Sequence, residues 1–215
     1  MRNYSIDSRL SFAYNAISNA LRNDDIKKAM LEYGYDDASI KSGRTLYEEA
    51  HILHSIQLRE YGDQLFVTND LIQAKAEANI IYVRHLKLAR IALRDSYELS
   101  EVICLNDKTS FSLFGWLDQV NSFYKKINHS SPQVALLLKN IGLTEEKLKI
   151  GLQKVKAVET KLDKQLKKDG EAHKSTKKRD NAFDVMNDWV TDFMEIASIA
   201  LESRPESLEI LGLSR

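Results

Sequence analysis

Glu48 and His51 are the residues whose types and spacing come nearest to a metal site. A Glu-x-x-His pair on a helix places both ligands on one face, as ferritin-like di-iron sites require. Such a site needs a second pair and two further carboxylates. The residues 108 positions further on are Lys156 and Glu159, so the second pair is missing. Metal binding at Glu48 and His51 is therefore an alternative hypothesis, and no cofactor is predicted.

The segment 161–179 is the most basic part of the chain. It contains eight Lys and Arg residues against three Asp and Glu residues, and such a segment can bind the phosphates of nucleic acid or of lipid headgroups. No Phe, Tyr or Trp is interleaved to stack on bases. A solvated helix end is thus the favoured interpretation, and polyanion binding is the alternative. The candidate binding residues are Lys167, Lys168, Lys174, Lys177, Lys178 and Arg179.

No other arrangement of residues indicates catalysis. No glycine-rich phosphate loop follows a strand, and no Ser–His or Cys–His pair can be argued from spacing. Trp116, Phe123 and Tyr124 are spaced as the core face of a helix, with a ligand cleft as the alternative. The protein is therefore predicted to be non-enzymatic.

The composition favours long helices in a soluble protein. Only two prolines and eight glycines occur in 215 residues, and 43% of the residues are hydrophobic. Lys plus Arg and Asp plus Glu both total 31, so no global charge attracts nucleic acid or a membrane. No apolar run approaches the roughly 20 residues of a transmembrane helix. Cys104 is the single cysteine, which excludes a disulfide framework and favours a cytoplasmic location.

The two halves of the chain resemble one another at an offset of 108 residues. Without a gap, Gly34, Gly43 and Gly62 align with Gly142, Gly151 and Gly170. Shared helical periodicity alone would not align three glycines. The sequence therefore predicts a tandem duplication, and further identities in the same frame include Asn79 with Asn187 and Ala89 with Ala197.

Each half begins with a medium and a short helix. The first half predicts helices over about 8–22, capped by Asp7, and about 24–33. Their copies are expected at about 110–128 and from Ser131-Pro132 to Gly142, where glycine ends the helix. Short helices are expected at the close of each half, over 96–105 and 205–213.

Between these lie two proline-free segments, 37–95 and 145–203, which open at Asp36 and Thr144. A single helix of that length would be about 87 Å long, more than a small compact domain spans. Each segment is therefore predicted to be a helical hairpin, and Gly43 and Gly151 are expected where a neighbouring helix approaches closely. The expected reversals lie in 62–70 and 170–180.

The predicted fold is all-α. It is a helical bundle in which a medium helix, a short helix and a long helical hairpin occur twice, with pseudo-twofold symmetry. The repeats would be 1–107 and 108–215, packed as one compact domain.

Four segments carry a resemblance to known proteins: Tyr33-Gly34-Tyr35, Ile40-Lys41-Ser42-Gly43, Leu88–Leu93 and Leu208–Gly212. Together they resemble a group of uncharacterised bacterial all-helical bundle proteins. The resemblance implies a bacterial, cytoplasmic, all-α protein and brings no activity with it.

The leading hypothesis is a cytoplasmic interaction or structural protein that binds a protein partner or associates with itself. The alternatives are polyanion binding through the 161–179 hairpin tip, with nucleic acid not favoured, and a metalloprotein that uses Glu48 and His51.

Overall fold

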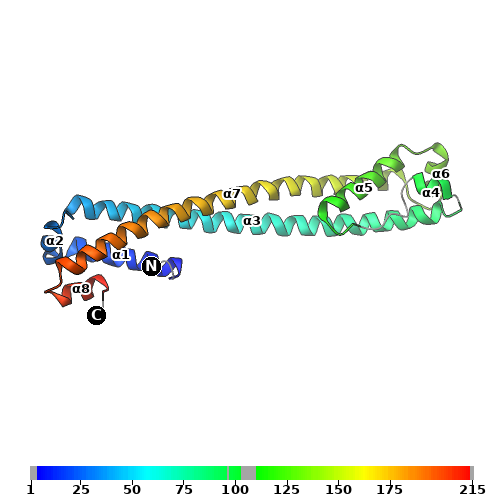
Figure 1. Ribbon diagram of the computed structural model, residues 1–215. Helices are drawn as coiled ribbons and strands as arrows, with labels where there is room; N and C mark the ends of the chain where they lie inside the picture. The colour runs from blue at the N-terminus through cyan, green and yellow to red at the C-terminus, as the bar shows by residue number, and fades with distance from the viewer. Residues whose placement is uncertain (1–3, 96, 103–109, 214–215) are drawn as a thin grey trace. The chain divides into compact units, whose positions relative to one another are not determined.

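The computed structural model describes residues 4–95, 97–102 and 110–213. Within these residues every regular element is an α-helix, as the composition predicts, and none is long and apolar enough to cross a membrane. In chain order the helices are α1 (Ile6–Arg22), α2 (Asp24–Leu31), α3 (Asp37–Ala92), α4 (Tyr97–Val102), α5 (Leu113–Asn128), α6 (Pro132–Asn140), α7 (Glu145–Ala200) and α8 (Pro205–Leu211) (Figure 1).

The helices follow one another in two similar series. The first has 17, 8, 56 and 6 residues and the second has 16, 9, 56 and 7. This order agrees with the predicted medium and short helices of each half. Residues 103–109, which include Cys104 and the end of the predicted 96–105 helix, lie outside the described residues.

The predicted helical hairpins are wrong. Helices α3 and α7 each run without interruption through the expected reversals, 62–70 and 170–180. The apolar face of each long helix is covered by the other long helix, because segments of α3 and α7 pack antiparallel. A glycine inside a helix costs only about 1 kcal/mol. Gly62 and Gly170 are therefore tolerated, and the polar stretch 169–181 is part of a continuous helix rather than a turn.

The described chain divides into two compact units. Unit 1 contains residues 1–62 and 170–215, and unit 2 contains residues 63–169. Each unit thus takes segments from both 1–107 and 108–215. The division of the sequence into those two halves stays a prediction.

Glycines end the short helices as predicted. Gly34 and Gly142 lie in the left-handed region with φ of 86° and 79°. In both cases the next amide donates to a carbonyl oxygen five residues back, which is the Schellman arrangement. The two bonds are Tyr35 N to Met30 O at 3.1 Å and Leu143 N to Leu138 O at 3.0 Å.

Side-chain caps begin the helices that follow. The Asp36 carboxylate accepts from Ser39 N at 2.7 Å, and the Thr144 hydroxyl accepts from Lys147 N at 3.4 Å. These caps confirm the predicted starts of α3 and α7. The cap predicted for α1 is wrong, because the Ser5 hydroxyl, not Asp7, accepts from the Ser8 amide at 3.1 Å.

Unit 1 has its own apolar core. The buried faces of α1 and α2 pack on the first part of α3 and the last part of α7, and α8 lies beside α1 (Figure 1). The Asn19 side chain on α1 donates to the Ile210 carbonyl oxygen of α8 at 2.6 Å. Fully buried members of this core include Ile17, Ile26, Met30, Val190 and Phe193.

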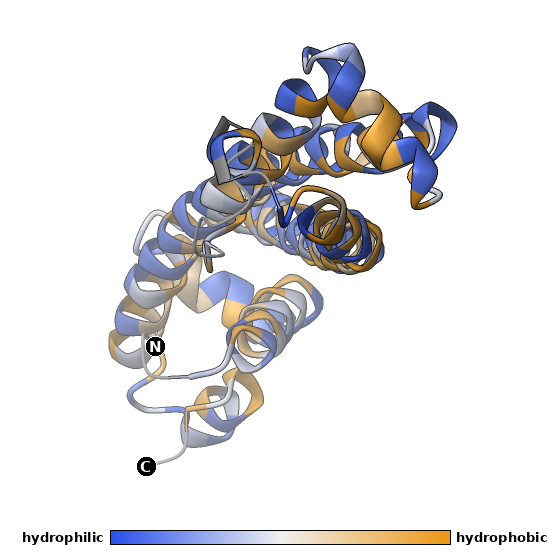
Figure 2. Ribbon diagram, turned by 90° about the vertical axis from the view of Figure 1, so that its right-hand side faces the viewer, coloured by the Kyte–Doolittle hydropathy of each residue, from blue (hydrophilic) through white to orange (hydrophobic). Residues whose placement is uncertain are grey.

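Unit 2 has a separate core of the same kind. Helices α5 and α6 supply buried aromatic and aliphatic side chains that pack on α3 and α7. Figure 2 shows hydrophobic and hydrophilic residues alternating along the helices, as expected of helices buried on one side. Buried members of this core include Trp116, Val120, Phe123, Leu138, Val155 and Val158.

Candidate functional site

The basic segment 161–179 lies inside α7 and is not a hairpin tip. In unit 2, three ion pairs join α7 to α3, and successive pairs are seven residues apart on both helices. Asp63 and Lys168 lie 3.1 Å apart, Asp70 and Lys161 2.8 Å, and Glu77 and Lys154 2.9 Å. This ladder sets an antiparallel register of coiled-coil type. The ladder gives two lysines of the basic segment, Lys161 and Lys168, a structural role. The seven-residue spacing of the three acids could have been recognised in the sequence.

The structure separates the six candidate binding residues into two groups. Lys168 pairs with Asp63, and half-buried Arg179 donates to Asp180 and, at 3.0 Å, to the Gln57 amide oxygen. These two residues therefore stabilise helix packing. The other four are exposed and form no hydrogen bond or ion pair within the described residues: Lys167 in unit 2, and Lys174, Lys177 and Lys178 in unit 1.

Glu48 and His51 are exposed on α3, but they contact different neighbours. The Glu48 carboxylate accepts from Arg44 Nε at 2.9 Å. The His51 ring stacks on Tyr47 with centroids 5.9 Å apart. Over the described residues, no group of three or more His, Cys, Asp or Glu side chains could hold a metal ion. Metal binding at Glu48 and His51 stays a prediction.

The surroundings of His51 form an open groove of about 380 Å³ between α1 and α3. The Arg44 guanidinium lies 4.9 Å from the centre of the Tyr14 ring and 5.5 Å from that of Tyr47, within the range of cation–π attraction. Asp7 Oδ1 at the groove is 3.8 Å from His54 Nε2. Sequence reasoning missed this cluster, because α1 contributes Asp7 and Tyr14 from a distant part of the sequence.

A buried His–Tyr pair lies in unit 2. His85 Nδ1 and the Tyr124 hydroxyl are 3.0 Å apart, and both residues are buried. Burial lowers the pKa of His85, with Arg84 and Lys147 adding to the effect. Burial also raises the pKa of Tyr124, with Tyr82 contributing. The pair is therefore neutral at physiological pH.

Gly43 and Gly151 make room for aromatic side chains. A Cβ atom on Gly151 would overlap the Tyr124 hydroxyl, and one on Gly43 would overlap the Trp189 ring. The expected close approach is confirmed at both positions, since in each case the glycine admits a side chain from a neighbouring helix. Neither glycine is free to contact a ligand.

Asn79 and Asn187, which align at the offset of 108 residues, make corresponding hydrogen bonds. The Asn79 Oδ1 atom accepts from Trp116 Nε1 at 2.9 Å, and the Asn187 Oδ1 atom accepts from Arg9 Nε at 3.3 Å. Each bond joins a long helix to the medium helix of its own unit. The Asn187 side-chain nitrogen is buried without a hydrogen-bond partner among the described residues, as is His54 Nδ1. Asparagine at both aligned positions is thus explained by a structural role, the hydrogen bond that joins two helices.

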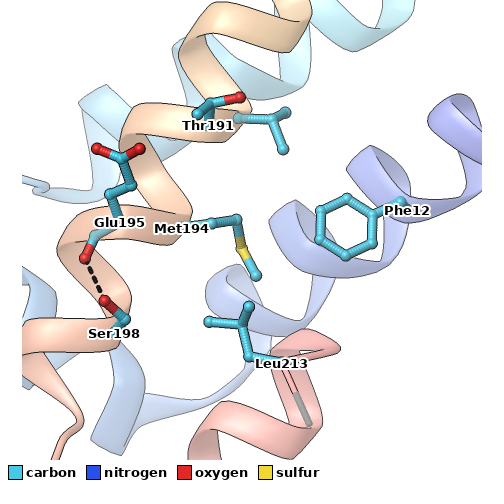
Figure 3. Close-up of a pocket in the computed structure, with 7 residues that line it drawn as sticks. Phe12, Thr191, Met194, Glu195, Ser198 and Leu213 are labelled. Carbon is cyan, nitrogen blue, oxygen red and sulfur yellow. Dashed lines mark hydrogen bonds between the residues drawn. The ribbon is translucent and has the colours of Figure 1, made fainter. Parts of the chain in front are cut away.

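A second groove in unit 1, of about 300 Å³, is apolar (Figure 3). Phe12, Met194 and Leu213 face one another across it, whereas the Glu195 carboxylate points away. The Ser198 hydroxyl donates to the Glu195 backbone oxygen at 2.7 Å and is occupied by the helix itself. This groove can accept apolar groups, and the Thr191 hydroxyl at its edge likewise donates to a backbone oxygen of α7, that of Asn187.

An exposed apolar surface of unit 2 lies on α3. Eight residues between positions 64 and 80 are exposed, and only Glu77 among them is charged; its carboxylate pairs with Lys154. The large side chains of this surface are Leu65, Phe66, Ile72 and Ile80, which are 48%, 69%, 61% and 63% exposed. We call these four residues the α3 apolar face.

Comparisons of the chain with protein families, with curated proteins and with solved structures find no match. The residues described above are therefore the basis for a proposed function.

Proposed function

We propose that the protein is a non-enzymatic helical bundle that acts by binding another protein. The observation that carries this proposal is the α3 apolar face of unit 2. A helix surface that meets only water normally carries charged side chains. Large apolar side chains gathered on an exposed face are typical of protein interaction sites. The partner that fits this face is a helix with an apolar stripe, laid along α3.

A double substitution tests this proposal. Ile72→Glu with Ile80→Glu puts charges on the face but leaves both cores intact, so circular dichroism and thermal unfolding should be unchanged. The immobilised wild-type protein should retain a stoichiometric protein from native cells, and the double variant should lose it. The matched control is Ile150→Glu, which changes a side chain 52% exposed on α7 of the same unit.

Three outcomes would count against the proposal. The double variant could retain the same partner, the wild-type protein could retain none, or it could purify with a stoichiometric metal, nucleotide or small molecule. Elemental analysis of the purified protein tests Glu48 and His51 as metal ligands in the same preparation.

Polyanion binding is the second candidate, and the exposed lysines of α7 favour it. Lys174, Lys177 and Lys178 have no partner within the described residues, so their charges are free to neutralise phosphates. Retention on heparin at physiological salt that is lost on replacing these three lysines by Gln would support it. Arg179 is left unchanged in that variant because it joins α7 to Gln57.

We further propose that the two series of helices arose by tandem duplication and that the protein is cytoplasmic. The duplication is supported by the corresponding helix lengths, the paired Schellman turns and the corresponding asparagine bonds. The predicted pseudo-twofold symmetry of the halves would follow from it. A single cysteine in 215 residues supports a reducing compartment.

A further inference from the structure

The outer surface of α7 in unit 1 carries a second seam of coiled-coil spacing. Its residues are separated alternately by four and three positions, the spacing that keeps side chains on one side of a helix. All six are exposed, and none lies in the apolar core of the unit. We call them the α7 seam: Lys174, Lys178, Asn181, Val185, Asp188 and Asp192.

Charge is divided along this seam. Lysines occupy its N-terminal end, with exposed Lys177 beside them, and aspartates occupy its C-terminal end, with exposed Asp184 nearby. Over the part of the chain that the structure describes, none of the four charged seam residues forms an ion pair or hydrogen bond. Both the positive and the negative charges of the seam can therefore pair with charges of a partner.

The middle of the seam is uncharged and borders a groove. Val185 is 53% exposed, although it is aliphatic. It lines a groove of about 430 Å³ between α3 and α7 of unit 1, together with Leu46, Leu53 and Asn181. An apolar side chain from a partner would be desolvated there.

We propose that a second copy of this chain packs antiparallel along the α7 seam. A twofold axis passing α7 near position 183 brings Lys174 against Asp192 of the second copy, because each lies nine residues from 183. It brings Lys178 against Asp188, five residues from 183 on either side, and both contacts occur twice. Each Val185 side chain then lies against Asn181 of the second copy near the centre, beside the groove that both residues line. Such a self-complementary contact is the usual form of a twofold interface.

The charge pattern selects this occupant and its direction. A parallel second copy would set lysine against lysine and aspartate against aspartate, which is unfavourable. A polyanion would match the lysines and be repelled by Asp188 and Asp192 on the same side of the helix. The inference goes beyond the proposed function, because it concerns a different helix segment in a different unit from the α3 apolar face.

Two charge-reversed variants test the proposal. One carries Lys174→Glu, Lys177→Glu and Lys178→Glu, and the other carries Asp184→Lys, Asp188→Lys and Asp192→Lys. Sedimentation velocity over a concentration series should show a wild-type dimer that weakens as salt is added. Each variant alone should be monomeric, and an equimolar mixture should regain the dimer, because the two seams are again complementary.

The matched control has the same change of charge elsewhere on α7. Lys149→Glu, Lys164→Glu and Lys167→Glu reverses three exposed lysines outside the seam, and this variant should dimerise like the wild type. Circular dichroism confirms that each variant is folded. The proposal is overturned by a monomeric wild-type chain, by a dimer that survives both reversals, or by variants whose mixture stays monomeric. Retention on heparin by a wild-type chain that stays monomeric would assign the lysines to a polyanion instead.

Discussion

At the residue scale, burial decides what the polar side chains can do. His85 is held neutral because its imidazole lies in the core of unit 2 beside Tyr124. The pKa of His85 is lowered from its ordinary value of 6.5, first by burial and then by Arg84 and Lys147. In the unfolded chain His85 titrates normally. Its protonation state therefore couples folding to pH.

The first prediction concerns this coupling. As pH falls through 6.5, the unfolded chain binds a proton at His85 before the folded chain does, so the free energy of unfolding should decrease. The contribution of His85 should be complete above pH 6.5 and should be lost on acidification toward its lowered folded pKa. Urea titrations between about pH 8 and pH 5 measure this change. In His85→Gln the decrease should be smaller, and an equal decrease in both proteins would assign it to other groups.

The second prediction concerns the two glycines beside aromatic rings. Gly43→Ala and Gly151→Ala should each destabilise the fold, because the new Cβ would overlap Trp189 or Tyr124. The loss should exceed the gain of up to about 1 kcal/mol that alanine brings to a helix, giving a net cost on the order of 1–3 kcal/mol. Denaturant unfolding measures it. Equal or higher stability in both variants would show that the aromatic rings move aside freely.

At the element scale, the continuity of α3 and α7 is the feature to test. The third prediction is that Gly62→Ala and Gly170→Ala each stabilise the protein by about 0.5–1 kcal/mol. Both glycines are helical, and a Cβ atom on either would contact nothing within 4 Å. These substitutions are the matched partners of those at Gly43 and Gly151. Destabilisation at Gly62 and Gly170 would instead indicate the turns that the hairpin prediction placed there.

The sequence predicted the helices better than their pairing. Caps and terminating glycines act within one turn, so Asp36, Thr144, Gly34 and Gly142 identified helix ends correctly. The hairpins were inferred from length alone, because a single helix of about 87 Å exceeds the span of a small compact domain. In the structure, the apolar face of each long helix is covered by the other long helix. The seven-residue spacing of Asp63, Asp70 and Glu77 was the signal that could have shown it.

The candidate site was predicted in part, for a similar reason. Composition identifies a basic segment, but it does not say which lysines face an acid on another helix. Lys168 does face one, in Asp63, whereas Lys174, Lys177 and Lys178 remain exposed. Contacts such as His85 with Tyr124 join residues 39 positions apart. No local pattern predicts such a contact.

At the scale of the whole molecule, the described chain has two apolar cores. Each is built from a medium helix, a short helix and segments of both long helices. No buried residue belongs to both cores. Because cooperative unfolding follows buried contacts, each unit should lose its amide protection mainly through damage to its own core.

The fourth prediction compares one phenylalanine from each core. Phe193 of unit 1 is fully buried and Phe123 of unit 2 is 3% exposed. Replacing either by Ala should cost about 3–5 kcal/mol of local stability, because a cavity is left. Native-state hydrogen exchange should show faster exchange in α1 and α2 for Phe193→Ala, with α5 and α6 little changed. Phe123→Ala should give the opposite pattern. If both variants speed exchange equally in all four helices, the long helices transmit the damage and the two cores unfold together.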